Sequence, residues 1–260
     1  MNTMNSPAPG AGGATETVGL IPARWGSTRF PGKSLALIAG VPLVVRVWRR
    51  ARQARALTRL AIATDDDRIR AAAEAAGAEV VMTRADHPSG TDRVAEAAAR
   101  MNAAIVVNIQ GDEPLIEPEL IDRLAAALRE DSRWDMATAV APLETPADLH
   151  EPSVVKVVRA ADGAALYFSR AAIPFARDGE AGAAGYLRHI GIYAYRRAFL
   201  DRLVREPPCA LEMTEKLEQL RALHLGGRIR CLDTAASGVG VDAPADVARA
   251  EAALRARGLE

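Results

Sequence analysis

Two aspartates lie in glycine-containing turns where a divalent cation could be held beside a phosphate. Asp112 follows a very apolar run, in the segment QGDEP at 110–114, and Asp242 lies in GVD at 240–242, before the last helical pattern. Mg2+ usually takes one or two carboxylates plus substrate phosphates and waters. Either aspartate could instead cap a helix, and for Asp242 taken alone a cap is the simpler interpretation. We predict that the pair converges on one magnesium ion, provided that the fold brings them together.

A basic loop over residues 22–33 is a candidate for binding phosphate. It contains Arg24, Arg29 and Lys33 together with two glycines and two prolines. Successive backbone N–H groups in such a turn form an anion site, and arginine can bind phosphate oxygens in pairs. The spacing fits neither a P-loop nor the dinucleotide fingerprint. A solvated basic loop is the alternative, but a position directly after a first strand favours phosphate binding.

A strand-like run over residues 187–195 could line a cleft with polar groups. Strict alternation places His189, Tyr193 and Tyr195 on one face. A lone buried histidine is more often a satisfied core residue than a functional one. The cysteines, Cys209 and Cys231, do not have metal-ligand spacing, and no zinc site or Ser-His-Asp order stands out.

These residues need a sheet to bring them together, and the apolar periodicity predicts one. Strand patterns alternate with helical patterns over the first half of the chain, which indicates a parallel sheet with helices on both faces. The strands are expected at 17–21, 59–64, 79–82 and 104–109, and the helices at 41–55, 65–76, 91–101 and 118–129. After residue 139 strands follow without long helices between them, at 154–158, 164–168 and 187–195. Helical patterns return at 198–205, 214–225 and 245–257.

The predicted fold class is therefore α/β, a doubly wound and mostly parallel sheet with a smaller mixed-sheet insertion lobe. We predict a single domain over residues 17–260, with the insertion lobe at 140–200. Residues 1–16 are rich in Pro, Gly, Ala and Thr and are expected to be a disordered extension.

Composition excludes several classes of function. The formal net charge of the 260 residues is +0, so no global field would attract nucleic acid or an anionic membrane. No apolar run is long enough to span a bilayer, and the N-terminus carries no signal-peptide pattern. We expect a cytoplasmic protein without nucleic-acid or membrane partners.

Several long motifs in order resemble those of the 3-deoxy-manno-octulosonate cytidylyltransferases, and the likeness runs from about residue 18 to the last helix. The motifs are IPAR at 21–24, STR at 27–29 with PGK at 31–33, MTRADH at 82–87 with SGTDR at 89–93, NIQGDEP at 108–114, ALYFSR at 165–170, the runs at 187–195 and 215–221, and GVD at 240–242. The resemblance implies a nucleotide-diphospho-sugar transferase-like fold. It also implies transfer of CMP from CTP to the acidic sugar 3-deoxy-D-manno-octulosonate (Kdo), with release of pyrophosphate, for lipopolysaccharide biosynthesis.

The resemblance also implies roles for particular residues of this chain. CTP would be bound by Pro22, Ala23, Arg24, Arg29, Lys33, Thr83, Arg84, Ser89, Gly90 and Gln110. Kdo would be bound by Gln110, Arg170, His189, Tyr193, Glu218 and Gln219. Asp112 and Asp242 would hold Mg2+, and these two with Arg24 and Lys33 would be the catalytic set. The insertion lobe is expected to form a homodimer interface. CMP transfer to 8-amino-Kdo or a sialic acid is an alternative, and a nucleotide-binding protein without turnover is an alternative of another class.

Overall fold

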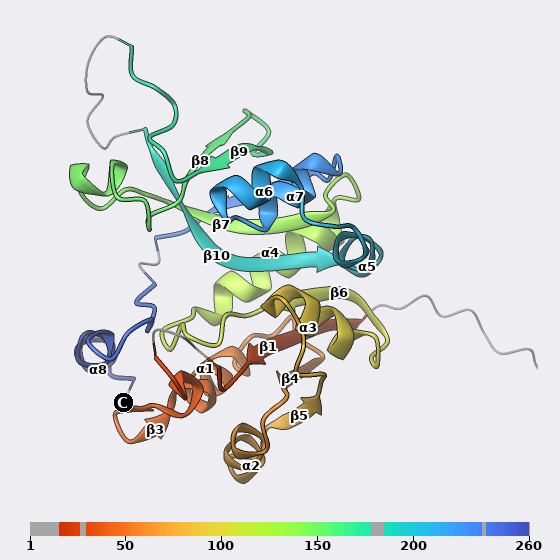
Figure 1. Ribbon diagram of the computed structural model, residues 1–260, viewed down its shortest axis with the longest axis vertical. Coiled ribbons are helices and arrows are strands. Elements are labelled where there is room, and N and C mark those ends of the chain that lie inside the picture. Colours follow the sequence, from red (N-terminus) through yellow and green to blue (C-terminus); the bar gives the residue numbers. More distant parts are fainter. Residues whose placement is uncertain (1–15, 27–29, 178–184, 236–237, 260) are drawn as a thin grey trace, which may run out of the picture.

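One large mixed sheet organises the chain (Figure 1). The computed structural model describes residues 16–26, 30–177, 185–235 and 238–259. Within these residues, seven strands lie side by side in the order β11-β7-β10-β6-β1-β4-β5. Their bounds are Ile229–Asp233 (β11), Met136–Pro142 (β7), Leu187–Arg196 (β10), Ala103–Asn108 (β6), Glu16–Ala23 (β1), Arg59–Thr64 (β4) and Glu79–Met82 (β5).

The strand directions divide the sheet into two parts. Strands β6, β1, β4 and β5 are parallel to one another, whereas β10 is antiparallel to both β6 and β7. The hairpin of β8 (Lys156–Arg159) and β9 (Ala165–Ser169) is added to the start of β10. A separate two-stranded sheet pairs β2 (Leu37–Ile38) with β3 (Val41–Pro42). The predicted fold class is confirmed.

Helices cover both faces of the sheet because its strands are apolar on both faces. One core contains Ile21 of β1 and buried residues of α1 (Leu43–Ala51), α2 (Asp67–Ala75), α4 (Pro118–Glu130) and α8 (Asp246–Ala256). The other contains Leu20 of the same strand and residues of α3 (Gly90–Ala98), α5 (Arg197–Arg205) and α7 (Gln219–His224). Neighbouring residues of one strand thus belong to different cores, as a doubly wound sheet requires.

The structure differs from the predicted elements at several places. Strands β2, β3, β7 and β11 were not predicted, and the predicted helix at 214–225 is two helices, α6 (Ala210–Glu215) and α7. They are separate because Lys216 has a left-handed backbone, with φ 54 and ψ 47. Glu16, assigned to the disordered extension, lies in β1, while residues 1–15 lie outside the described residues. The last strand of the predicted insertion at 140–200, β10, runs through the middle of the main sheet.

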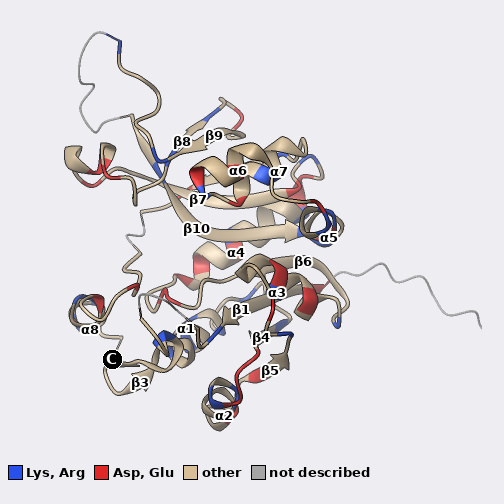
Figure 2. Ribbon diagram, in the orientation of Figure 1, with Lys and Arg blue, Asp and Glu red and all other residues tan. Residues whose placement is uncertain are grey.

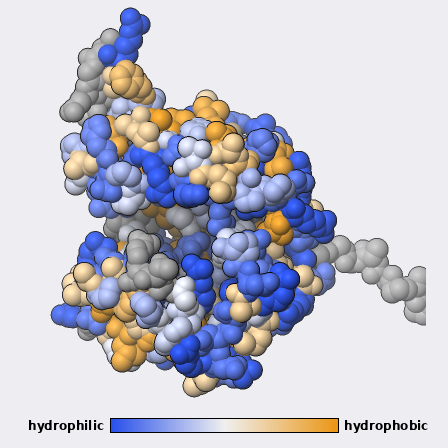
Figure 3. Space-filling view, viewed as in Figure 1, coloured by the Kyte–Doolittle hydropathy of each residue, from blue (hydrophilic) through white to orange (hydrophobic). Residues whose placement is uncertain are grey.

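Acidic and basic residues are intermixed along the ribbon in Figure 2. In the space-filling view the molecule is hollowed between an upper half, formed by β7–β11 and α5–α7, and a lower half around β1, β4 and β5 (Figure 3). No helix in the described ranges combines the length and the apolar character that a membrane span needs.

Candidate functional site

The loop after β6 carries the first predicted carboxylate to the edge of the sheet. Ile109 extends the strand, since its N–H donates to Leu20 O at 2.9 Å. The chain then turns close against the end of β1, where a Cβ on Gly111 would lie 2.9 Å from Pro22 O. Glycine is needed there for the close approach, and the turn sets Asp112 beside the basic loop that follows β1.

The second predicted carboxylate is attached to this loop by the backbone. Val241 N–H donates to Asp112 O at 2.9 Å, although the two residues are far apart in the sequence. The helix-capping alternative for Asp242 is not what the structure shows. Instead Asp246 accepts the backbone N–H groups of Asp242 and Ala243, at 2.9 and 2.8 Å, and these hydrogen bonds lower the pKa of Asp246.

The two aspartates meet at one ammonium group. Lys33 Nζ donates to Asp112 Oδ2 at 2.8 Å and to Asp242 Oδ1 at 3.1 Å. Burial alone would lower the pKa of Lys33, but the two carboxylates hold it above its ordinary value. The predicted convergence of the two carboxylates and the basic loop is therefore a feature of this structure. Arg29 lies outside the described residues.

Glu113 was missed as a site residue by the sequence reasoning. Burial, followed by the negative charges of Asp112 and Asp242, raises the pKa of Glu113 to about 7, against opposing positive charges on Arg188 and Lys33. The carboxylate is confined by the segment that carries Asp242, because a Cβ on Gly238 would lie 2.7 Å from Glu113 Oε2. The only signal in the sequence was its place next to Asp112, and its burial depends on contacts with a distant segment.

The residues around this cluster fit a magnesium ion in number and type. Mg2+ is commonly held by one or two carboxylates, with phosphates and waters completing six ligands. Asp112 and Asp242 offer two such groups, and the Lys33 ammonium shows that a cation is stable between them. Within the residues that the structure describes, no group of three or more His, Cys, Asp or Glu side chains forms a site supplied by protein alone.

Two adjoining hollows share this cluster. The lower hollow, about 300 Å³, is lined by the end of β1 and the start of α3, and the upper hollow, about 510 Å³, by β10 and the loop before α7. Gly90, Gln110, Asp112 and Asp242 line both. Both volumes are in the range of small-molecule sites.

The lower hollow gathers most of the residues predicted to bind CTP. The predicted residues that line it are Pro22, Ala23, Arg24, Lys33, Ser89, Gly90 and Gln110. Thr83 and Arg84 do not line it: Thr83 accepts a hydrogen bond from Arg93, and the Arg84 N–H donates to Glu96 at 3.1 Å. Arg93, which is buried, and His87 line the hollow but were not predicted. The signal for both was their place in the MTRADH and SGTDR motifs.

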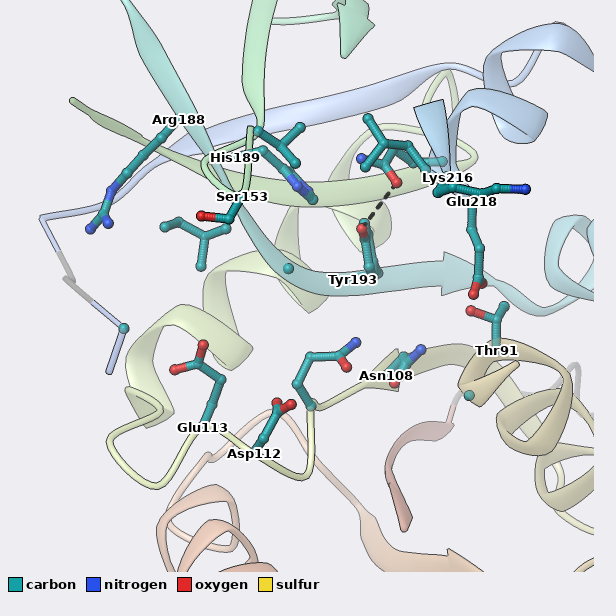
Figure 4. A pocket seen from close by; sticks show the side chains of 18 of the residues that line it. Thr91, Asn108, Asp112, Glu113, Ser153, Arg188, His189, Tyr193, Lys216 and Glu218 are labelled. Atoms are coloured by element: carbon teal, nitrogen blue, oxygen red, sulfur yellow. Dashed lines mark hydrogen bonds between the residues drawn. The ribbon is translucent and has the colours of Figure 1, made fainter. Parts of the chain in front are cut away.

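The upper hollow gathers the residues predicted to bind the sugar, apart from Arg170. Figure 4 shows His189 and Tyr193 projecting from β10 above Asp112 and Glu113. Gln110, Glu218 and Gln219 also line this hollow. The Arg170 side chain is outside its lining and donates to the backbone carbonyls of Glu215, Pro152 and Lys216.

The aromatic wall of the upper hollow is uncharged. Burial lowers the pKa of His189 to about 3, so the ring is neutral at physiological pH. Its Nε2 shares a hydrogen bond of 2.9 Å with Thr138 Oγ1, and the ring packs edge-on against Phe168. Tyr193 OH donates to Gln219 Oε1 at 3.4 Å, and burial raises the pKa of Tyr193 above its usual range. These groups can orient a ligand by hydrogen bonds but not exchange protons easily near neutral pH.

The fold and the site define a class. A doubly wound sheet with a basic loop and paired carboxylates at its edge, beside two hollows, is the arrangement of an α/β nucleotidyltransferase. A family model described as cytidylyltransferase matches residues 18–229. A 3-deoxy-manno-octulosonate cytidylyltransferase of Geobacter sulfurreducens is 51% identical over 237 residues, covering 88% of this chain and 95% of the relative. One of Anaeromyxobacter sp. is 53% identical over 239 residues, covering 91% and 96%.

A solved structure of a CMP:2-keto-3-deoxy-manno-octonic acid synthetase complexed with CTP matches with a TM-score of 0.89 at 42% identity, covering 94% of this chain and 100% of that one. The chain therefore belongs to the 3-deoxy-manno-octulosonate cytidylyltransferase family, as the motifs predicted. A 4-diphosphocytidyl-2C-methyl-D-erythritol synthase of Anaerococcus prevotii, with a TM-score of 0.64 and 11% identity, shares the fold alone.

Proposed function

We propose that this protein transfers CMP from CTP to Kdo and releases pyrophosphate. The observation that carries the proposal is the meeting of Lys33, Asp112 and Asp242 at the junction of the two hollows. Most residues that the family resemblance assigns to the nucleotide line the lower hollow, and most of those assigned to the sugar line the upper one. A phosphoryl group between the two substrates would therefore lie against the charged cluster.

In the proposed reaction, the anomeric hydroxyl oxygen of Kdo forms a bond to the α-phosphorus of CTP. The bond from that phosphorus to the bridging oxygen of the β-phosphate breaks, pyrophosphate leaves, and the hydroxyl proton is released. Lys33 and Arg24 bind the phosphates and stabilise the charge that builds on the leaving group. Gln110, Tyr193 and Gln219 orient the sugar so that its hydroxyl faces the phosphorus, which is mainly an entropic contribution.

We propose that Asp112 and Asp242 hold a magnesium ion during turnover. When bound, such an ion neutralises phosphate charge and favours departure of the pyrophosphate. Lys33 already lies between the two carboxylates, so it must move towards the phosphates when a cation is bound. Support comes from the two carboxylates, which converge on one cation in this structure.

We also propose that the protein acts in the cytoplasm as a homodimer and that its product serves lipopolysaccharide biosynthesis. Exposed apolar side chains on β9 and α6 support an interface: Leu166 is 59% exposed, Met213 51% and Leu211 42%. Light scattering after gel filtration measures the mass, and Leu166→Glu should shift it towards the monomer.

The function is tested by pyrophosphate release from CTP. Purified protein with CTP, Kdo and Mg2+ should release pyrophosphate, and Asp112→Ala or Asp242→Ala should remove most of it. Asp162→Ala, a surface aspartate that pairs with Arg228, is the matched control and should retain activity. No release by the wild type with any of Kdo, 8-amino-Kdo or a sialic acid, together with tight CTP binding, would favour the non-catalytic alternative. Faster pyrophosphate release with 8-amino-Kdo or a sialic acid would show that the preferred substrate is that sugar, while the proposed CMP transfer would stand.

A further inference from the structure

The upper hollow has an excess of acidic side chains although its proposed ligand is itself an acid. Among the described residues that line it, the carboxylates are Asp112, Glu113, Glu218 and Asp242. The cationic side chains in the same lining are Arg188 and Lys216. A sugar carboxylate entering this hollow needs a cationic partner, because an unpaired charge in a partly buried site is costly.

Arg170, which the family resemblance suggests for the acidic sugar, already makes three side-chain hydrogen bonds to backbone carbonyls. Its Nε donates to Glu215 O at 2.8 Å and its Nη1 to Pro152 O at 2.8 Å, with a longer contact from Nη2 to Lys216 O at 3.4 Å. In this arrangement Arg170 joins β9 to the loop before α7 and to the loop before β8. Its charge is close to Lys216, whose side chain is exposed.

Arg188 is the better placed of the cations. It lies on β10 directly before His189, and one Nη pairs with Glu144 Oε1 at 2.7 Å. Its Nε is buried and donates no hydrogen bond within the described part of the chain. The guanidinium therefore makes one ion pair among the described residues, and its remaining donors can bind a second anion. In Figure 4 Arg188 projects on the side of the hollow that also holds Glu113.

The position of Arg188 matches the chemistry of a 2-ulosonic acid. In such a sugar the carboxyl carbon is bonded directly to the anomeric carbon, which bears the reacting hydroxyl. The cation that binds the carboxylate must therefore lie near the charged cluster where the hydroxyl reacts. Arg188 meets this condition, since it lines the same hollow as Asp112 and Asp242.

We propose that Arg188 is a specificity-determining residue that binds the carboxylate of the acidic sugar, held in place by its ion pair with Glu144. The inference rests on the proposed function and adds to it the group that selects an acid over a neutral sugar. Lys216 and Arg170 act on the same region as positioning residues, through the backbone turn before α7.

The test compares Arg188→Gln with wild type on two sugars, Kdo and its C1 amide, in which the carboxylate charge is absent. Loss of a charge-assisted pair should lower kcat/KM for Kdo by about 10- to 100-fold, and the KM for CTP should change by less than about 3-fold. With the amide, the kcat/KM values of wild type and Arg188→Gln should agree within about 3-fold, because no carboxylate remains to be bound. The kcat/KM of Arg188→Lys for Kdo should lie between those of wild type and Arg188→Gln, since lysine keeps the charge and loses the planar pair of donors.

Two further variants separate this role from a general loss of structure. Arg159→Gln removes a guanidinium that pairs with Asp233 outside the hollow. This variant should have the kcat/KM of the wild type with both sugars. Arg170→Gln should lower activity on Kdo and on the amide together, because it disturbs the backbone turn. A loss confined to Kdo in Arg170→Gln, or an equal loss on both sugars in Arg188→Gln, would overturn the inference.

Failure of the proposed function has a different signature. If the wild type releases no pyrophosphate with Kdo, calorimetry of Kdo titrated into protein with CMP still measures binding without reaction. Weaker binding of Kdo, but not of the amide, by Arg188→Gln would support the inference. Equal affinities, or no binding of Kdo by the wild type, would overturn it.

Discussion

Replacing Glu113 by glutamine should make the stability of the protein less dependent on pH. The side chain keeps its size and loses its charge, so the variant isolates the electrostatic cost of a carboxylate beside Asp112 and Asp242. In the metal-free protein, Glu113→Gln should be close to wild type in unfolding free energy at pH 5 and clearly more stable than wild type at pH 8.

The size and the sign follow from the pKa of Glu113. It is about 7 in the folded protein against an ordinary value of 4.5, because burial and two neighbouring carboxylates disfavour the charged form. Between these two values the folded state binds more protons than the unfolded state, so wild-type stability falls as the pH rises. Each pKa unit corresponds to about 1.4 kcal/mol, so the full loss approaches about 3 kcal/mol above pH 7. Glutamine at this position avoids that loss.

Urea unfolding followed by circular dichroism at pH 5, 6, 7 and 8, with EDTA present, measures the effect. Glu119→Gln makes the same chemical change on an exposed side chain of α4 and gives the baseline to be subtracted. The reasoning would be refuted if the difference in unfolding free energy between Glu113→Gln and wild type were constant from pH 5 to pH 8. The carboxyl group of Glu113 would then not change its charge in this pH range.

Three further predictions concern other contacts of the site and its supports. Lys33→Met should lower kcat for pyrophosphate release by roughly 10²- to 10³-fold, since it removes a cation from the phosphate position. Asp66→Ala should cost about 1 kcal/mol in urea unfolding, because Asp66 caps α2 by accepting the N–H groups of Arg68 and Ile69. Lys216→Gly should raise the unfolding free energy by about 1 kcal/mol, since glycine adopts the left-handed backbone there without strain; a decrease would show that the lysine side chain stabilises the turn.

The half of the fold in which strands alternate with helices was predictable, because each of these elements has its own hydrophobic periodicity in the sequence. The four parallel strands β1, β4, β5 and β6 all lie where apolar runs predicted them. Strand β7 was missed because its sequence, MATAVAP, is made of small residues that are almost all buried and so shows no alternation. The break between α6 and α7 was missed because the local sequence at Lys216 contains no glycine or proline to mark a left-handed turn.

The site was predictable to the extent that its residues stand in recognisable segments. The pairing of Asp112 with Asp242 could be proposed but not established from the sequence, because it depends on one backbone hydrogen bond across the chain, from Val241 to Asp112. Glu113 was not predicted as a site residue, since its raised pKa comes mainly from burial, which only the fold sets. The role proposed for Arg188 depends on its place in the lining of the upper hollow, which the sequence does not reveal. Arg170 illustrates the reverse case: its motif matches the family, but in this structure its side chain donates to backbone carbonyls and is not part of the lining of the upper hollow.

The same feature that lowers the stability of this protein also supports its proposed chemistry. Lys33 pairs with the carboxylates of Asp112 and Asp242, and Glu113 follows Asp112 directly, so one ammonium group only partly neutralises the negative charge of the cluster. Replacing the carboxylates by neutral residues would relieve that repulsion, as the Glu113→Gln prediction states, but would remove the groups proposed to hold a divalent cation. A costly arrangement of charges at the junction of two hollows is typical of a functional site, because activity often trades off against stability. A cation bound between Asp112 and Asp242 should therefore both raise the stability of the wild type and lower the pKa of Glu113.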